Sequence, residues 1–176
     1  MSSSKISIKQ ATENDLRDIL DIYNDAILNT TAVYDYKPHT FEMRKAWFDG
    51  KMKYGFPVFV AKLDEQTVGF SSYGHFRAWA AYKYTVESSV YVSPEHRGNK
   101  IGSQLLPPLI ESARANNLHA LMAGIDANNS ISVHLHKKFG YSEVGKFPQV
   151  GYKFGKWLDL LFLQLLLDTP TQPVEE

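Results

Sequence analysis

One short stretch combines the residue types that bind phosphate, at a spacing that exposes backbone amides. An expected strand ends at Ser93-Pro94, because proline lacks an amide proton and disfavours helix in the residue before it. Arg97-Gly98-Asn99-Lys100-Ile101-Gly102 follows with two cationic side chains and leads into apolar residues at helical spacing. The unpaired amides and positive dipole end of a helix N-terminus face such a turn. The stretch therefore predicts an anion site that would fit a pyrophosphate.

Two common phosphate-binding turns do not match this stretch. The P-loop of NTPases closes on Gly-Lys-Ser/Thr, and Gly102-Ser103-Gln104 has no lysine. The dinucleotide-binding fingerprint needs a third glycine and an acidic residue about 20 positions further along, at the end of a second strand, and it does not fit either. Another class of phosphate-binding turn must be considered.

The stretch resembles the acetyl-CoA turn of the GCN5-related N-acetyltransferases (GNAT), whose signature is Arg/Gln-x-x-Gly-x-Gly/Ala. Arg97, Ile101 and Gly102 are in register with it, whereas Lys100 stands where the family usually has glycine. A lysine there must either adopt an unusual backbone angle or reshape the turn slightly. Because its amide can still point at a phosphate, we expect an altered affinity for the cofactor and not a lost function.

A second motif of the same family follows at about the right distance. The family pattern is Asn-x-x-Ala/Ser-x-x-Leu-Tyr/His with Gly-Phe/Tyr a few residues on. It is matched position by position by Asn129, Ser132, Leu135, His136 and Gly140-Tyr141. The two motifs occur in the family's order, so together they are a far more specific signal than either alone.

His136 is the candidate proton-transfer residue of this motif, because the ordinary histidine pKa near 6.5 suits proton transfer around neutrality. The alternative is a histidine that packs beside the core. His134 is two residues away on the expected helix and points elsewhere. The other histidines show no metal-ligand spacing, so we expect no metal; they are His39, His75, His96 and His119.

The residues from Tyr84 to Val92 resemble the Thr-Val-Glu-x-Ser/Thr-Val-Tyr-Val segment of the phosphinothricin and methionine sulfoximine acetyltransferases. The likeness extends from about Ile6 to Leu166. It implies that Glu87 is the general base, directly or through water, and that His136 is its acid or base partner. A free carboxylate with a pKa near 4.3 is a poor base, so burial would have to raise that pKa. The alternative for Glu87 is an ion pair with a surface lysine.

The same resemblance assigns the remaining site residues. Arg77 would bind an amino-acid carboxylate with its planar guanidinium, although a solvated surface arginine is the alternative. For the cofactor, the resemblance implies contacts from Val90, Tyr91, Val92, Arg97, Gly98, Asn99, Lys100, Ile101, Gly102, Ser103, Asn129 and Ser132. For the acceptor pocket, it implies Phe76, Arg77, Ala80, Ala81 and Tyr82.

The resemblance implies an α+β (three-layer α/β) GNAT fold with a mixed, mostly antiparallel sheet of about seven strands and about four helices. Apolar residues recur at helical spacing in four segments of the sequence, which is the same number of helices. Pro107 and Pro108 lie inside the third helix, where we expect a kink or break near Leu106. We expect helices and strands at the following positions, with a loop that contains several glycines between the last two strands. The helices are 16–28, 41–52 (capped by Thr40), 101–113 and 130–139, and the strands are 5–9, 56–61, 67–73, 84–92, 120–125, 141–144 and 158–165.

Composition narrows the function classes. The chain has 176 residues, of which 44% are hydrophobic and 22% charged, as in an ordinary globular protein. Lysine plus arginine and aspartate plus glutamate both number 19, so no net field attracts nucleic acid or an anionic membrane. The absence of cysteine excludes thiolate catalysis. We expect a single domain over residues 1–167 with a flexible tail at 168–176, no signal peptide in residues 1–4, and a cytoplasmic location.

The resulting expectation is an enzyme that transfers the acetyl group of acetyl-CoA directly to the primary amine of a small amino-acid-like acceptor. The phosphinothricin and methionine sulfoximine type is the expected acceptor class, and the family resemblance implies a homodimer. Two alternatives remain open. One is the same chemistry on another amino acid, a polyamine or a protein N-terminus, and the other is a non-catalytic acyl-CoA-binding module.

Overall fold

The computed structural model describes residues 5–175. The expectation that residues 1–4 are no signal peptide therefore lies outside the described residues, as does the end of the predicted tail, Glu176. The chain divides into two compact units. The first unit comprises residues 1–72 and 89–109, and the second comprises residues 73–88 and 110–176. The expectation of a single domain stays a prediction.

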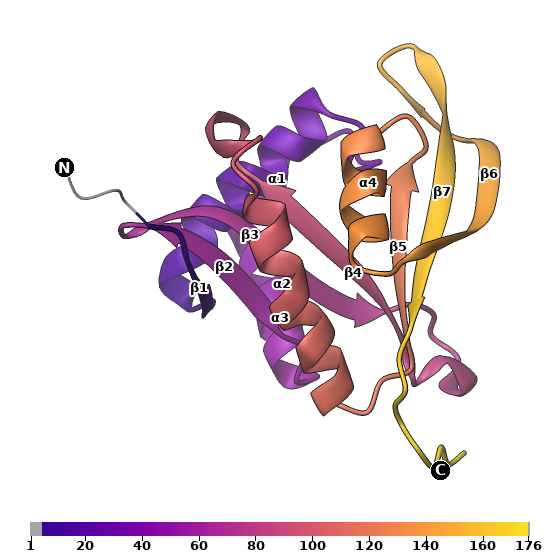
Figure 1. The fold of residues 1–176 in the computed structure, drawn as a ribbon. Helices are drawn as coiled ribbons and strands as arrows, with labels where there is room; N and C mark the ends of the chain where they lie inside the picture. Colours follow the sequence, from indigo (N-terminus) through magenta and orange to yellow (C-terminus); the bar gives the residue numbers. More distant parts are fainter. Residues whose placement is uncertain (1–4, 176) are drawn as a thin grey trace. The chain divides into compact units, whose positions relative to one another are not determined.

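The seven strands form one hydrogen-bonded sheet in the order β1-β2-β3-β4-β5-β7-β6 (Figure 1). The pairs β1–β2, β2–β3, β5–β7 and β6–β7 are antiparallel, and β4–β5 is parallel. With four helices, this confirms the predicted mixed α+β sheet. The strands are β1 (Ser7–Gln10), β2 (Val58–Leu63), β3 (Gln66–His75), β4 (Thr85–Val92), β5 (Ala120–Asp126), β6 (Ser142–Lys153) and β7 (Lys156–Leu166). The helices are α1 (Leu16–Asn29), α2 (Phe41–Lys53), α3 (Ile101–Ala115) and α4 (Ser130–Lys138), with short 3₁₀ turns at Glu13–Asp15, Ala80–Tyr82 and Pro94–His96.

The first unit is built on apolar side chains that α1 and α2 pack against β2 and β3. Leu16 and Ile19 of α1, Phe48 of α2, and Val60 and Phe70 of the two strands belong to one buried cluster. The 3₁₀ turn Glu13–Asp15, directly before α1, is held by Asp15, whose carboxylate accepts a hydrogen bond from the Thr12 amide at 2.7 Å. This is the capping-box geometry that the Thr12-x-x-Asp15 spacing predicts.

Asp15 also anchors the helix end to the sheet. Its side chain is only 3% exposed, forms an ion pair with Lys62 of β2, and accepts a hydrogen bond from the Thr67 hydroxyl at 2.8 Å. Burial opposes ionisation of this carboxyl, but the contacts with Lys62, Thr12 and Thr67 outweigh it and lower the Asp15 pKa.

The second unit contains the long hairpin of β6 and β7 together with β5 and α4, and the tip of the hairpin extends beyond the start of α4 (Figure 1). Helix α4 ends at Gly140, which has a φ of +91°. The Tyr141 amide donates to the His136 carbonyl at 3.2 Å, so a left-handed glycine closes the end of the helix. Large side chains on the hairpin are exposed, including Tyr152, Phe154 and Trp157.

One prediction about secondary structure is wrong. The segment with Gly145 and Gly151 is part of strand β6 and not a loop, because register shifts near both glycines let β6 stay paired with β7. Gly155, with a φ of +74°, forms the turn of that hairpin.

Of the kink or break predicted near Leu106, the break is absent, because α3 runs through Pro107 and Pro108, while the kink stays a prediction. Leu105, Leu106 and Leu109 are fully buried. Burying such side chains stabilises the helix by about 1.5–3 kcal/mol each, which offsets the lost backbone hydrogen bonds.

The C-terminal residues of the described chain contact the second unit. The Thr169 hydroxyl donates to the Leu118 carbonyl, and the Val174 amide donates to the Tyr84 hydroxyl at 3.0 Å. The flexibility expected for residues 168–176 stays a prediction.

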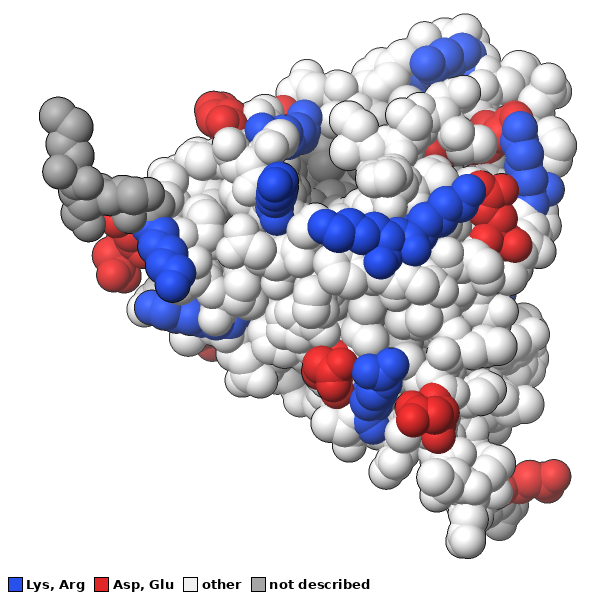
Figure 2. Space-filling model, viewed as in Figure 1, with Lys and Arg blue, Asp and Glu red and all other residues white. Residues whose placement is uncertain are grey.

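The described residues contain no helix long and apolar enough to cross a membrane. On the face shown in Figure 2, cationic and anionic side chains of the described residues alternate, and neither sign dominates a broad area. This distribution agrees with the equal numbers of basic and acidic residues in the sequence.

Candidate active site

In the first unit, the turn that precedes α3 has the backbone geometry of an anion site. Gly98 and Lys100 have φ values of +83° and +58°, so the chain enters the left-handed region twice. The unusual backbone angle, one of the two predicted alternatives for Lys100, is therefore confirmed. Within residues 5–175, the amides of Gly98, Asn99 and Lys100 donate no backbone hydrogen bond. They are free to donate to a ligand.

The two cations of this turn have different surroundings. The Arg97 guanidinium donates to the Asp25 carboxylate of α1 at 2.6 Å and to the Val92 carbonyl at 3.2 Å. It therefore holds the turn against α1 and the end of β4. Lys100 is exposed and makes no ion pair with any residue that the structure describes. Lys100 is thus the cation that is available to a phosphate group.

The β4 residues predicted to hold the cofactor arm lie against the same core as the turn. Val90 and Val92 pack against the buried cluster that includes Ile101 of α3. A side chain at Gly69 would come within 3.0 Å of the Tyr91 carbonyl oxygen and 3.1 Å of Ile101. This close approach of β3 fixes the position of the β4 backbone beside the start of α3.

In the second unit, Glu87 lies on a sheet face that strand register defines. Glu87 of β4 pairs with Met122 of β5, so Gly124, two residues along β5, shares its face. Gly124 in turn pairs with Phe162 of β7. The face therefore presents Glu87, the bare backbone of Gly124 and the Phe162 ring side by side.

The environment of Glu87 suits a general base. Burial raises the pKa of its carboxyl above the ordinary value, and the positive charge of Arg77 acts in the opposite direction. A raised pKa makes the carboxylate a stronger proton acceptor near neutral pH. The structure thus supplies the burial that a useful base at this position requires, while its catalytic role stays a prediction.

The residues predicted for the acceptor pocket form an aromatic group on this unit. The Phe76 ring lies 5.8 Å from the Tyr82 ring and 5.9 Å from the Phe162 ring. Arg77 is exposed and places its guanidinium 5.1 Å from the Phe76 ring. Ala80, Ala81 and Tyr82 form a 3₁₀ turn in which none of the three residues is buried.

Two aromatic contacts extend this group beyond the predicted residues. The Phe147 ring of β6 lies 5.8 Å from Phe162, and Trp79 lies 6.5 Å from Tyr82. Phe147, Phe162 and Gly124 were missed at the sequence level. The register of β5 and β7 brings Gly124 and Phe162 together, whereas the position of Phe147 also depends on a register shift in β6 that no sequence motif marks.

His136 is buried in the second unit, 3% exposed, with its ring edge-to-face on Tyr141 at 5.0 Å. Its Nδ1 lies 2.8 Å from the Ser132 carbonyl oxygen, so Nδ1 carries the proton and donates. Nε2 is buried without a hydrogen-bond partner among the described residues. Burial lowers the His136 pKa, against the smaller opposing effect of the Ser132 carbonyl. The neutral ring therefore presents a lone pair and has no proton to give from Nε2.

Asn129 and Ser132 have structural roles in this unit. The Asn129 side-chain oxygen accepts the Ser132 amide at 3.1 Å and so caps the N-terminus of α4. Ser132 presents its carbonyl to His136, one turn further along. The Asn129 amide group keeps its donors for a ligand, so its predicted contact with the cofactor is compatible with the cap.

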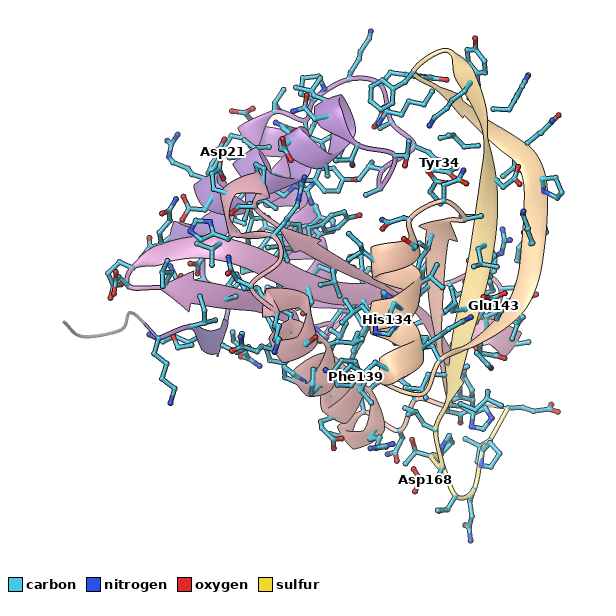
Figure 3. All side chains as sticks on the ribbon, turned by 45° about the horizontal axis from the view of Figure 1, so that its top comes forward. Asp21, Tyr34, His134, Phe139, Glu143 and Asp168 are labelled. Atoms are coloured by element: carbon cyan, nitrogen blue, oxygen red, sulfur yellow. The ribbon has the colours of Figure 1, made fainter. Side chains whose placement is uncertain are left out.

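A separate pocket of about 380 Å³ lies between α4 and the β6–β7 hairpin, away from Glu87 and His136. It includes His134 of α4 and Glu143 of β6, both labelled in Figure 3, and Glu143 forms an ion pair with Lys137 at 2.6 Å. His134 thus faces this pocket while His136 is buried. Across residues 5–175, no group of three or more histidine, aspartate or glutamate side chains could hold a metal ion.

Comparison with known proteins decides the family. The sequence profile of the acetyltransferase (GNAT) domain matches residues 8–162. The chain belongs to the GNAT family. This membership confirms the resemblance seen in the phosphate turn and in the motif around His136.

Individual relatives agree with the GNAT assignment. The chain is 47% identical to the L-methionine sulfoximine/L-methionine sulfone acetyltransferase of Pseudomonas paraeruginosa, covering 94% of this chain and 96% of the relative. It is 41% identical to the L-amino acid N-acyltransferase MnaT of Escherichia coli, covering 96% and 98%. A crystal structure of the phosphinothricin acetyltransferase of Sinorhizobium meliloti in complex with acetyl-CoA superposes with a TM-score of 0.90 at 33% identity, covering 96% and 92%.

The turn before α3 fits the pyrophosphate of acetyl-CoA. The free amides of Gly98, Asn99 and Lys100 and the N-terminus of α3 supply donors, and the Lys100 ammonium supplies charge. GNAT relatives have been crystallised with acetyl-CoA, including the Salmonella typhimurium protein that is 39% identical to this chain.

Proposed function

We propose that this chain is an acetyl-CoA-dependent N-acetyltransferase that acts on a small amino-acid-like acceptor of the methionine sulfoximine and phosphinothricin type. The relatives named above support the acceptor class. The observation that carries the proposal is the half-buried Glu87 carboxylate, with a raised pKa, within electrostatic range of the exposed guanidinium of Arg77. One group can accept an ammonium proton while the other binds a carboxylate on the same small molecule.

The roles of the residues follow from this arrangement. Acetyl-CoA supplies an activated acetyl group, so a nitrogen–carbon bond forms, a carbon–sulfur bond breaks, and CoA leaves as the thiol. Glu87 takes the proton that the acceptor ammonium must lose before its nitrogen can attack. Arg77 orients the acceptor through its carboxylate, with two parallel hydrogen bonds. Phe76, Tyr82 and Phe162 exclude water on the apolar side.

For His136 the geometry favours a neutral positioning role over that of an acid. An imidazolium would be needed to protonate the thiolate, and burial disfavours the charged ring. The Nδ1 proton is engaged with the Ser132 carbonyl. We therefore propose that His136 stabilises α4, and through it the Asn129 cap, and that solvent returns the proton to the sulfur.

A homodimer is also part of the proposal. Strand β6 is a sheet edge of 12 residues, and its hairpin with β7 exposes Phe147, Val150, Tyr152, Phe154 and Trp157. Half-exposed aromatic side chains present roughly 100 Å² each, so these four supply about half of the ~800 Å² per partner of a stable interface. Pairing with a second copy would cover an edge that is otherwise open to aggregation. Light scattering at micromolar concentration tests it, and a monomer would contradict it.

Acetylation of phosphinothricin blocks its amine, so we further propose that the enzyme can confer resistance to such compounds. Its use of acetyl-CoA fits a cytoplasmic location.

The test is release of CoA thiol from acetyl-CoA with an acceptor panel. The panel holds phosphinothricin, methionine sulfoximine, methionine sulfone, the common amino acids, a polyamine and a short peptide. We expect turnover of the sulfoximine, sulfone or phosphinothricin that collapses in Glu87→Gln. Turnover of ordinary amino acids alone would favour the activity named for the E. coli relative, and turnover of polyamine or peptide alone would overturn the acceptor class. Acetyl-CoA binding without turnover would point to a non-catalytic module.

A further inference from the structure

Gly124 is a glycine whose backbone does not require glycine. Its φ lies outside the left-handed region, unlike those of Gly98, Gly140 and Gly155. It lies in the middle of β5, where glycine weakens a strand and usually marks a close approach of another group. The reason for the missing side chain must therefore be the space beside it.

That space is occupied by the carboxylate of Glu87. A Cβ atom on Gly124 would lie 3.0 Å from Glu87 Oε1, 3.3 Å from Phe162 Cε1 and 3.5 Å from Leu160 Cδ1. The first contact is closer than real Cβ atoms normally tolerate, and the second is also tight. The bare backbone of Gly124 is thus the floor of a niche, Phe162 and Leu160 of β7 form its wall, and one oxygen of Glu87 fills it.

Strand register explains why these groups meet. Glu87 pairs with Met122 in the parallel β4–β5 ladder, so Gly124 is its diagonal neighbour on the same face. Gly124 pairs directly with Phe162 in the antiparallel β5–β7 ladder. Because backbone hydrogen bonds fix all three Cα positions, only side-chain movement can relieve crowding in the niche. The freest of these side chains is the Glu87 carboxylate.

We propose that Gly124 is a positioning residue for the reaction: its missing side chain creates the niche that holds the Glu87 carboxylate in place for proton transfer. This inference rests on the proposed function, in which Glu87 is the base. Gly124 itself touches no reacting atom and acts only through Glu87. The burial that raises the Glu87 pKa is a consequence of the same niche.

The test compares Gly124→Ala with Gly145→Ala. Gly145 of β6 also pairs with Phe162, but a Cβ there would meet only Phe147, at an ordinary 3.6 Å. With methionine sulfoximine as acceptor, Gly124→Ala should lower kcat by less than the roughly 100-fold that a misplacement of about 1 Å costs, because the Glu87 carboxylate has to move by only a few tenths of an ångström. The Kd for acetyl-CoA should stay within twofold, and Gly145→Ala should keep both kcat and Kd.

A double variant separates positioning from a general structural effect. If Gly124 acts through the Glu87 carboxylate, Gly124→Ala should have almost no further effect on kcat in a Glu87→Gln background. An equal loss of kcat in both backgrounds would overturn the proposal. So would a folded Gly124→Ala enzyme with unchanged kcat and pH profile.

A readout that needs no turnover keeps the inference separate from the proposed function. Carbon-13 NMR of labelled glutamate carboxyls, with the Glu87 signal assigned through Glu87→Gln, follows titration of this group in the resting protein. In Gly124→Ala the displaced carboxyl regains water, so its titration midpoint should fall towards the ordinary glutamate value. In Gly145→Ala it should stay raised. If Gly124→Ala leaves the titration midpoint of Glu87 unchanged, the niche proposal is wrong, even if the enzyme acetylates every acceptor.

Should Gly124→Ala fail to fold, Glu87→Asp tests the niche from the other side. Its carboxyl is one methylene too short to reach the floor at Gly124. We expect its carboxyl to titrate in the ordinary range and kcat to fall with little change in acetyl-CoA affinity. A raised titration midpoint in Glu87→Asp would contradict the proposal. Failure of the wild-type protein to acetylate any acceptor would overturn the proposed function but leave the NMR result to decide the niche.

Discussion

Replacing Lys100 by glycine should stabilise the protein and weaken its hold on acetyl-CoA. Lys100 has a φ of +58° in the turn before α3, where the GNAT signature usually has glycine. A non-glycine residue in this region costs about 1–2 kcal/mol, and glycine removes that cost. Glycine also raises the conformational entropy of the unfolded chain, which offsets part of the gain in stability. The net gain should be about 1 kcal/mol, which raises Tm by about 2–4 °C in a chain of this size.

The side-chain charge has to be separated from the backbone effect. Lys100→Ala removes the ammonium but keeps a Cβ at the strained angle, so it should match the wild-type Tm within a degree or so. Both variants should weaken acetyl-CoA binding about two- to fivefold, the usual contribution of an exposed charge, and the loss should shrink at high salt.

The assays are thermal unfolding without ligand and calorimetric titration with acetyl-CoA at two salt concentrations. Equal Tm values for Lys100→Gly and Lys100→Ala would refute the claim that the turn is strained. An affinity for acetyl-CoA that is unchanged in both variants would show that the Lys100 ammonium makes no contribution to phosphate binding.

Three further predictions concern ionisable groups. Glu87→Gln should lower kcat about 100- to 10,000-fold. Because the folded-state pKa of Glu87 is raised, ionisation of its carboxyl lowers the stability of the protein at neutral pH. Glu87→Gln should therefore raise Tm at pH 8 and lose that advantage below the ordinary glutamate pKa. A lower Tm at pH 8 would contradict this. Because the pKa of His136 is lowered in the folded state, the wild-type protein should lose stability as pH falls from above about 6.5 through the folded-state pKa. His136→Phe should not show this loss of stability. Denaturant unfolding measured from pH 5 to 8 can detect the difference. Asp15→Asn should lower the free energy of unfolding by about 3 kcal/mol, because it leaves Lys62 unpaired near the core. Asp49→Asn, which breaks the exposed pair with Lys45, should lower it by under about 1 kcal/mol. Urea unfolding measures both values.

The local signals in the sequence predict much of this fold because local chemistry decides it. The Thr12–Asp15 capping box, the left-handed Gly140 and the strained Lys100 all depend on a few neighbouring residues. The glycines of β6 led to the wrong prediction of a loop, because Gly145 and Gly151 lie beside bulges in a strand that stays paired with β7. Pro107 and Pro108 were misleading because the helix penalty is local, whereas the burial that outweighs it at Leu105 and Leu109 comes from tertiary packing.

The candidate site shows the same division. Glu87 and His136 stand in motifs that the sequence displays, so both could be named as candidates, and their roles stay predictions. Their surroundings were not: the niche beside Gly124 and the Phe162 ring depend on the registers of β4–β5 and β5–β7, which pair residues far apart in the chain. The tautomer of His136 likewise follows from one distance to the Ser132 carbonyl and cannot be inferred from a motif.

The placement of the three tryptophans makes intrinsic fluorescence a separate reporter for each compact unit. Trp47 lies in the first unit, with its ring 4.6 Å from the Arg44 guanidinium and 6.0 Å from Phe70. Trp79 and Trp157 lie in the second unit and are 71% and 60% exposed. Emission from Trp47 should shift to the red when the first unit unfolds, whereas the exposed pair already emits from water and would shift to the blue on burial against another molecule. Variants that keep one tryptophan each would therefore show whether the two units melt in one transition, without any added label.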